Sequence, residues 1–285
     1  MNNNQDGANQ DHPKPIGVFD SGVGGLSVLH AIRRSHPEEA VLYFADQAHV
    51  PYGPRPLVEV RRFSQEITRY LLSLGAKLIV VACNTASAAA LDYLRQTFPG
   101  TPFVGMEPAV KPAAERTQTG RVGVLATPAT FQGELYASVV ERFASGVQVL
   151  QDTCPGLVEQ IEAGKLSGIE TRAILEKALY PMLEQDIDTV VLGCTHYPFV
   201  IPLIQEIAGS QVRVIDPAPA IARQVGRLLD AHQLHAGSEA ANTPAPVHFL
   251  TSGDPERLQA LLPHLWGESA QVAGVQWRSG RLSYR

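Results

Sequence analysis

The sequence lacks most features of extracellular, membrane or nucleic-acid-binding proteins. Only 3 of its 285 residues are cysteine, too few and too odd in number for a disulfide framework, so we expect free thiols in a reducing, cytoplasmic compartment. No run approaches the roughly 18 apolar residues of a membrane helix, and residues 1–15 lack the apolar stretch of a signal peptide. The net charge of −5 gives no basic footprint for nucleic acid. We therefore expect a small-molecule partner, with no nucleic acid and no membrane.

What is present is an ordinary globular composition with a strongly alternating pattern. The chain is 45% hydrophobic and 18% charged, and its length allows one large domain or two of about 140 residues. The polar segment 1–15 is predicted to be a disordered tail. Short apolar runs alternate with segments of helical period, which predicts an α/β fold with mostly parallel, helix-covered sheets. The predicted strands are 16–19, 41–44, 78–82, 102–106, 122–126, 147–150, 189–192, 212–215, 247–251 and 272–277. A single helix is predicted over 127–143, with Thr127 as its N-cap and Pro128 in its first turn.

The pattern restarts near the middle of the chain. Residues 16–19 (IGVF) match 122–125 (VGVL), and about 70 residues after each start a strand ends in a cysteine. One interpretation is chance, because βα units resemble one another. The other is two similar doubly wound domains related by a pseudo-two-fold, with a site in the cleft between them.

Cys83 and Cys194 are the candidate functional thiols. Each follows an apolar run directly and is itself followed by small polar residues. Open α/β sheets bind ligands just beyond the carboxyl ends of their strands, where polar groups suit a ligand better than a core. Cys154 lacks this context and is interpreted as a small buried hydrophobe.

Paired thiols allow several chemistries. A disulfide would need Cα atoms within about 7 Å. A zinc site could use Cys83, Cys194 and His196, although the short ligand spacings of structural zinc sites are absent. Acyl transfer leaves the second thiol superfluous, whereas proton transfer on opposite faces of a carbon uses both equivalently. A free thiol is mostly protonated at neutral pH, so neighbouring groups must adjust the pKa of each thiol. The candidates for this role are Asp20 and His196. An Asp before Ser-Gly is more often a turn or N-cap residue, and a lone His is more often structural.

The glycine-rich turn 22–25 is not a nucleotide motif. A dinucleotide fingerprint would need glycine at Ser27, and a P-loop would need Gly-Lys-Ser/Thr. The turn opens a helix whose free N–H groups suit a substrate carboxylate. Further expected donors are Tyr52, Gly53, Thr85, Thr127, Thr130 and Thr195. Together they predict a small polar substrate with two anionic ends.

Several stretches, in order, resemble the glutamate racemase family. They are 17–26 (GVFDSGVGGL), Pro51-Tyr52-Gly53, 82–86 (ACNTA), Thr127-x-x-Thr130 and 193–198 (GCTHYP). The resemblance covers residues 16 to about 216, with a weaker tail beyond. The related aspartate racemases tend to carry Glu where His196 stands, which favours glutamate. The alternatives are racemisation of another amino acid, an amino-acid receptor, and a thiol-metal or redox sensor.

The resemblance implies a cofactor-independent, metal-free racemisation of L- and D-glutamate that supplies D-glutamate for peptidoglycan. Cys83 and Cys194 would be the two bases: Cys194 would deprotonate L-glutamate and Cys83 D-glutamate, assisted by His196 and Asp20 respectively. A family glutamate near the second thiol falls on Glu162, with Glu159 as the alternative. The implied substrate-binding residues are Asp20, Ser21, Pro51, Tyr52, Gly53, Asn84, Thr85, Thr127, Thr130, Thr195 and His196. Homodimers are common in the family. The resemblance implies a first α/β domain formed by residues 16–107 and 217–285, and a second formed by residues 108–216.

Overall fold

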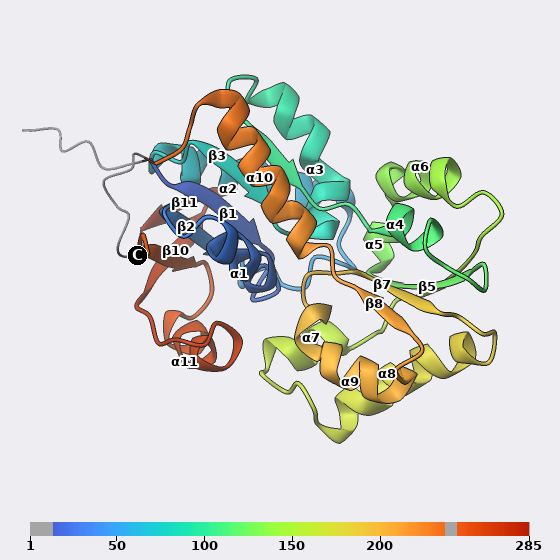
Figure 1. The fold of residues 1–285 in the computed structure, drawn as a ribbon. Helices are drawn as coiled ribbons and strands as arrows, with labels where there is room; N and C mark the ends of the chain where they lie inside the picture. Colours follow the sequence, from blue (N-terminus) through green and yellow to red (C-terminus); the bar gives the residue numbers. More distant parts are fainter. Residues whose placement is uncertain (1–13, 237–243, 285) are drawn as a thin grey trace, which may run out of the picture.

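The chain folds around two β-sheets, each covered by helices (Figure 1). The computed structural model describes residues 14–236 and 244–284. The predicted disordered tail, 1–15, lies outside the described residues except for its last two positions. One sheet has 7 strands in the order β11-β10-β9-β2-β1-β3-β4, and the other has 4 in the order β6-β5-β7-β8. The predicted α/β class with two mainly parallel sheets is therefore confirmed.

The larger sheet is formed by both ends of the described chain. Its strands are β1 (Ile16–Asp20), β2 (Val41–Ala45), β3 (Leu78–Val81), β4 (Phe103–Gly105), β9 (Val247–Thr251), β10 (Val272–Arg278) and β11 (Arg281–Tyr284). Central β1 is buried throughout, and its Phe19 is in register with Phe44 of β2 and Val81 of β3. Strands buried on both faces read as continuous apolar runs, which is why the sequence reveals them. Among the strands of the described residues, only the pair β10–β11 is antiparallel.

The smaller sheet repeats the strand order of the larger one. Its strands are β5 (Arg121–Ala126), β6 (Gln148–Asp152), β7 (Thr189–Gly193) and β8 (Arg213–Ile215), all paired in parallel. The order β6-β5-β7-β8 matches β2-β1-β3-β4: second strand, first, third, fourth. Strands β3 and β7 thus occupy equivalent places, and each runs into a candidate thiol. The predicted domain bounds and the pseudo-two-fold stay predictions.

Helices cover both sheets. They are α1 (Leu26–Ser35), α2 (Leu57–Ser73), α3 (Asn84–Thr97), α4 (Val110–Ala114), α5 (Pro128–Gln132), α6 (Glu134–Phe143), α7 (Leu157–Glu162), α8 (Ile169–Leu183), α9 (Ile201–Ala208), α10 (Ala218–His232) and α11 (Pro255–Leu265). A short 3₁₀ helix, η1, spans Tyr197–Val200. After β8 the chain returns to the larger sheet, where α10 packs against α1 (Figure 1). One buried apolar cluster includes side chains from both sheets, such as Val18 and Leu192.

The structure corrects one local prediction and shows short elements that the sequence did not reveal. The single helix expected over 127–143 is broken at Gly133, whose φ of −72° and ψ of 138° are extended. A Cβ at Gly133 would lie 2.8 Å from the Cβ of Ala88, so glycine allows the break to pack closely on α3. The sequence also showed no sign of η1, α4, α9 or β11. Helix α9 has only 8 residues, which are too few for a clear helical period.

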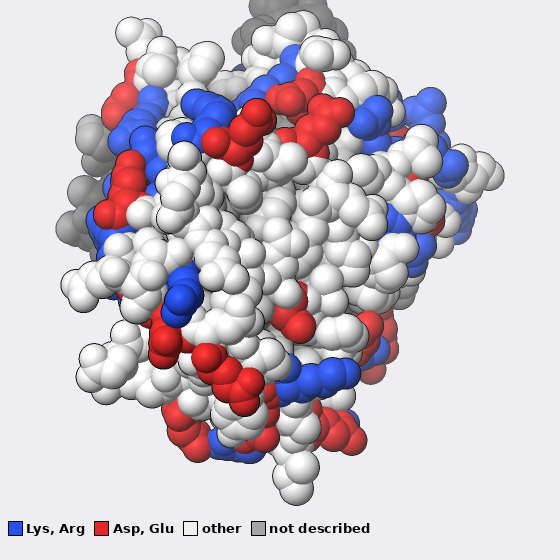
Figure 2. All heavy atoms as spheres, turned by 90° about the vertical axis from the view of Figure 1, so that its right-hand side faces the viewer, with Lys and Arg blue, Asp and Glu red and all other residues white. Residues whose placement is uncertain are grey.

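The surface carries charges of both signs. Over the face turned to the viewer in Figure 2, Lys and Arg side chains are interspersed with Asp and Glu, and the middle of the face is largely uncharged. The expectation that the chain does not bind nucleic acid stays a prediction from its net charge. Within the described residues, no helix is both long enough and apolar enough to span a membrane.

Candidate active site

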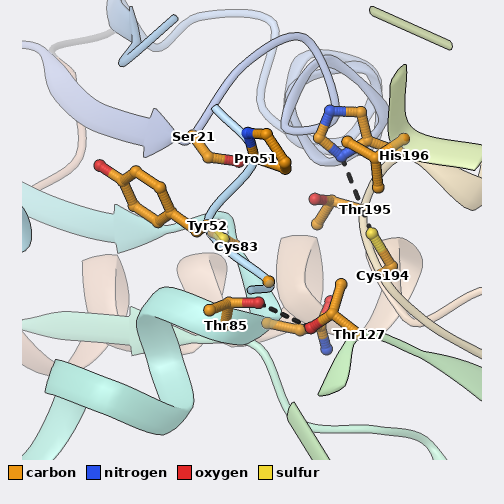
Figure 3. Close-up of a pocket in the computed structure, with 12 residues that line it drawn as sticks. Ser21, Pro51, Tyr52, Cys83, Thr85, Thr127, Cys194, Thr195 and His196 are labelled. Atoms are coloured by element: carbon orange, nitrogen blue, oxygen red, sulfur yellow. Dashed lines mark hydrogen bonds between the residues drawn. The ribbon is translucent and has the colours of Figure 1, made fainter. Parts of the chain in front are cut away.

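The two predicted thiols lie just beyond equivalent strands and line one cavity. Cys83 follows β3 and is the N-cap of α3, where its Sγ accepts a hydrogen bond of 3.4 Å from the N–H of Ala86. Cys194 follows β7, and its Sγ is 3.8 Å from Nδ1 of His196. Both cysteines are buried and free, and they lie on opposite sides of the cavity in Figure 3. The repeated strand order thus brings one thiol from each sheet to the same space.

Most of the predicted binding residues line this cavity. Its lining is Ser21, Pro51, Tyr52, Gly53, Cys83, Asn84, Thr85, Thr127, Val158, Cys194, Thr195 and His196. Of the residues predicted to contact substrate, Asp20 and Thr130 are not in the lining, although each bonds to a residue that is. Val158 was not predicted, because an apolar residue on a helix gives no signal beyond its burial.

The cavity is too small for an amino acid as it stands. Its volume is about 10 Å³, which is room for about one water molecule. An adjoining cavity of about 190 Å³ shares Pro51, Gly53, Thr127 and Val158 with it. Binding of an amino acid between these residues therefore requires the walls of the inner cavity to separate.

Asp20 is the buried carboxylate on the Cys83 side. It accepts hydrogen bonds from the N–H groups of Ser21 (2.6 Å) and Gly25 (2.5 Å), and from the Thr195 hydroxyl at 3.3 Å. Burial raises the pKa of Asp20, an effect that the nearby charge of His196 partly opposes. Burial and the Asp20 charge together raise the pKa of the Cys83 thiol well above its usual value. Cys83 is therefore held as a neutral thiol.

His196 and Glu162 form a buried ion pair on the Cys194 side. His196 Nε2 is 2.7 Å from Glu162 Oε1, and the two side chains are 2% and 7% exposed. Burial opposes charge on the imidazole, but its bonds to Cys194 and Glu162 raise the pKa of His196 well above its usual value. Burial likewise opposes charge on Glu162, yet the bonds from His196 and from the N–H of Val23 lower the pKa of that carboxyl. These bonds therefore favour the imidazolium form of His196 beside the sulfur of Cys194.

The structure distinguishes the two glutamates that the sequence left open. Glu162 is buried and reaches His196, whereas Glu159 is exposed and lines only the outer cavity. Glu162 is also joined to Gln47, whose Nε2 donates to Oε2 at 3.1 Å. Gln47 was not predicted, because a glutamine after a strand carries no signal of a partner 115 positions away.

The glycine-rich turn serves a different purpose from the one expected. A Cβ at Gly22 would lie 1.8 Å from Glu162 Oε1, and one at Gly24 would lie 2.4 Å from Nδ1 of His196. The N–H groups of the turn bond to the protein's own carboxylates, Val23 to Glu162 and Gly25 to Asp20. These N–H groups are therefore not free to bind a substrate carboxylate, and that prediction is wrong. Glycine is needed at 22 and 24 because a Cβ there would clash with Glu162 or His196.

Three of the predicted hydroxyl donors, Thr85, Thr127 and Thr130, are linked in a row. Thr127 Oγ1 is 2.8 Å from that of Thr85 and 2.9 Å from that of Thr130. The Tyr52 hydroxyl instead donates to Asp46 at 2.5 Å and points away from Thr85, Thr127 and Cys194 in Figure 3. Both amide atoms of Asn84 are buried without a hydrogen-bond partner among the described residues. Buried polar atoms are rarely left unpaired, so the Asn84 amide is suited to bind a polar ligand.

The metal and disulfide interpretations find no support in the geometry. Within the described residues, the ligand atoms of Cys83, Cys194 and His196 do not all come within 4.8 Å of one another, whereas those of Glu38, Glu39 and His235 do. All three cysteines are free, including Cys154, which is buried as its context predicted. The arrangement favours two separate thiols acting from opposite sides of one small ligand.

Comparison with known proteins is consistent with this arrangement. A family model described as Asp/Glu/Hydantoin racemase matches residues 17–225. The glutamate racemase of Pseudomonas paraeruginosa is 54% identical over 258 residues, which are 90% of this chain and 96% of that protein.

Solved structures are similar over nearly the whole chain. A glutamate racemase isoform from Bacillus anthracis has a TM-score of 0.82 at 30% identity, covering 95% of this chain and 100% of that one. Escherichia coli glutamate racemase, in complex with L-glutamate and the activator UDP-MurNAc-ala, has a TM-score of 0.78 at 32% identity, covering 92% and 98%. The predicted resemblance and the predicted enzyme class, an amino-acid racemase among the isomerases, are confirmed: the chain belongs to the Asp/Glu/Hydantoin racemase family.

Proposed function

We propose that the chain interconverts L- and D-glutamate by proton transfer between two thiols, without a cofactor, and that it supplies D-glutamate for peptidoglycan in the cytoplasm. The observation that carries the proposal is the pair of free, buried cysteines on opposite sides of one cavity. Glutamate as the substrate is supported by the relatives, one of which was solved with L-glutamate. The homodimer expected from the family stays a prediction.

The electrostatics support an assignment of roles in the direction from L to D. His196, whose Nδ1 is 3.8 Å from the Cys194 sulfur, is the kind of neighbour that activates a cysteine, which suits Cys194 to be the base. Cys83, with its raised pKa, suits the role of acid. The Cys194 thiolate would take the α-proton of L-glutamate, and the Cys83 thiol would give its proton to the opposite face of the carbanion. The reverse reaction exchanges the two roles.

Binding of the substrate would adjust these charges. The α-ammonium group of glutamate brings a positive charge into a cavity beside the buried Asp20, and an opposite charge favours the ionised form of a carboxyl. The amide of Asn84 and the hydroxyls of Thr85, Thr127 and Thr195 supply polar groups for the two carboxylates. Closure of the walls would exclude water, which strengthens these interactions because the local dielectric falls.

The test is uptake of deuterium at the α-carbon. The purified, dialysed protein is incubated with L-glutamate in D₂O without any cofactor, and both enantiomers are separated and examined by mass spectrometry at low conversion. We expect nearly every new D-glutamate molecule to carry one deuterium at the α-carbon. Formation of D-glutamate without deuterium, or only after addition of pyridoxal phosphate, would contradict the proposal. Parallel incubations with L-aspartate and L-alanine test the choice of substrate.

A further inference from the structure

Glu162 comes from one side of the cleft and is held from the other. Helix α7, which carries Glu162, and His196 after β7 belong to the part of the chain that forms the smaller sheet. The two other groups that bond to the carboxylate, the N–H of Val23 and the amide of Gln47, follow β1 and β2 of the larger sheet. These two bonds therefore exist only while the two sides are together.

The two oxygens of the carboxylate have different partners. Oε1 is 2.7 Å from both the Val23 nitrogen and His196 Nε2. Oε2 accepts a single hydrogen bond within the described residues, from the Gln47 amide at 3.1 Å. Because Glu162 is 5% exposed, loss of that amide would leave a charged oxygen buried and unpaired, and the carboxylate would rotate or take up a proton.

Gln47 is itself fixed from the C-terminal part of the sheet. The hydroxyl of Thr251, the last residue of β9, is 3.0 Å from Gln47 Oε1 and 3.1 Å from the Ala45 carbonyl oxygen, and its one proton is shared between these two acceptors. With Oε1 facing this hydroxyl, the NH₂ group of Gln47 is directed at Glu162. Gly253 allows this approach, because a Cβ there would lie 2.7 Å from the Cβ of Gln47. Because its amide is held in one orientation, Gln47 is suited to position the Glu162 carboxylate.

We propose that Gln47 is a positioning residue for the Cys194 side of the reaction: it holds Glu162 against His196, and so keeps the imidazolium beside Cys194 when the cleft is closed. The inference rests on the proposed two-thiol function. Gln47 does not line the cavity, so its effect reaches the substrate only through Glu162 and His196. The other titratable groups that face His196 are Cys194 next to it and Asp20 from β1.

The test compares Gln47→Met, which keeps the length and removes the donor, with Gln151→Met. Gln151 lies on edge strand β6 and bonds only to the Tyr136 hydroxyl, so it is a matched control outside the site. For Gln47→Met we expect kcat to fall about 10-fold, the cost of one hydrogen bond to a charged group, with KM nearly unchanged. The alkaline limb of the pH profile of kcat/KM should move to lower pH, because the His196 pKa falls. Thr251→Val should show the same changes to a smaller extent.

Two results would overturn the inference. One is wild-type kcat and an unmoved pH profile in Gln47→Met. The other is a loss of kcat at all pH values that is matched by Gln151→Met and explained by a lower unfolding temperature. Failure of the function itself is distinguishable: if Cys194→Ser retains racemisation the two-thiol reaction is wrong, whereas if Cys194→Ser is inactive and Gln47→Met is normal, only the role of Gln47 is wrong.

Discussion

Replacement of Glu162 by Gln removes one of the two partners, Cys194 and Glu162, that raise the pKa of His196. The variant retains the side chain's shape and an acceptor oxygen for Val23 and His196, which now bond to it at 2.7 Å each. It replaces a charge-assisted bond by a neutral one. Since a bond to a charged group contributes roughly 1.5–3 kcal/mol, and about 1.4 kcal/mol is a factor of ten in rate, kcat/KM should fall about 10- to 100-fold.

The deficit should depend on pH. In the wild type the Glu162 carboxylate helps to raise the pKa of His196, so Cys194 keeps its cationic neighbour to higher pH. In Glu162→Gln the imidazole should lose its proton at lower pH, and the deficit should widen as the pH rises.

The assay is polarimetric or circular-dichroism measurement of racemisation from pH 6 to 9, with Glu159→Gln as the control. Glu159 is on the same short helix but exposed, so that variant should retain wild-type activity. An unchanged alkaline limb in Glu162→Gln, or equal losses in the two variants, would refute the reasoning.

Three further predictions concern the glycine turn, the unpaired amide and stability. Gly22→Ala should reduce activity to a degree similar to Glu162→Gln, because its Cβ would lie 1.8 Å from Oε1; a fully active Gly22→Ala in the same assay would contradict this. Asn84→Ala should raise KM for glutamate far more than it lowers thermal stability, since its amide has no partner among the described residues; steady-state kinetics and calorimetry separate the two. The raised pKa of His196 contributes stability that is fully present below its usual value of about 6.5 and is lost as the pH rises through its folded value. Denaturant unfolding should therefore show a smaller loss of stability with rising pH for Glu162→Gln than for the wild type, and equal losses would count against the ion pair.

The fold could be predicted where the signal is local. Strands such as β3 and β7 are buried on both faces, so they appear in the sequence as unbroken apolar runs. The break at Gly133 could not be predicted, because it depends on contact with Ala88 of another helix. Helix α9 was missed because its 8 residues are too few to show a clear helical period.

The site shows the same division. Cys83 and Cys194 are marked by their place after strands, and the resemblance to a family supplied the polar residues around them. Glu162 and Glu159 are three residues apart on one short helix, so only tertiary structure shows which one is buried against His196. Gln47 has no sequence signal, since its importance comes from a contact between the two sides of the cleft.

The measurement that tests the central claim most directly is α-hydrogen exchange by variants with a single catalytic thiol. Each of Cys83→Ser and Cys194→Ser is incubated in D₂O with L-glutamate and separately with D-glutamate, and deuterium at the α-carbon is followed by NMR. With one base on each face, Cys83→Ser should exchange the α-hydrogen of L-glutamate alone, Cys194→Ser that of D-glutamate alone, and neither should racemise. Exchange of both enantiomers by one single-thiol variant, or racemisation by either, would contradict the account.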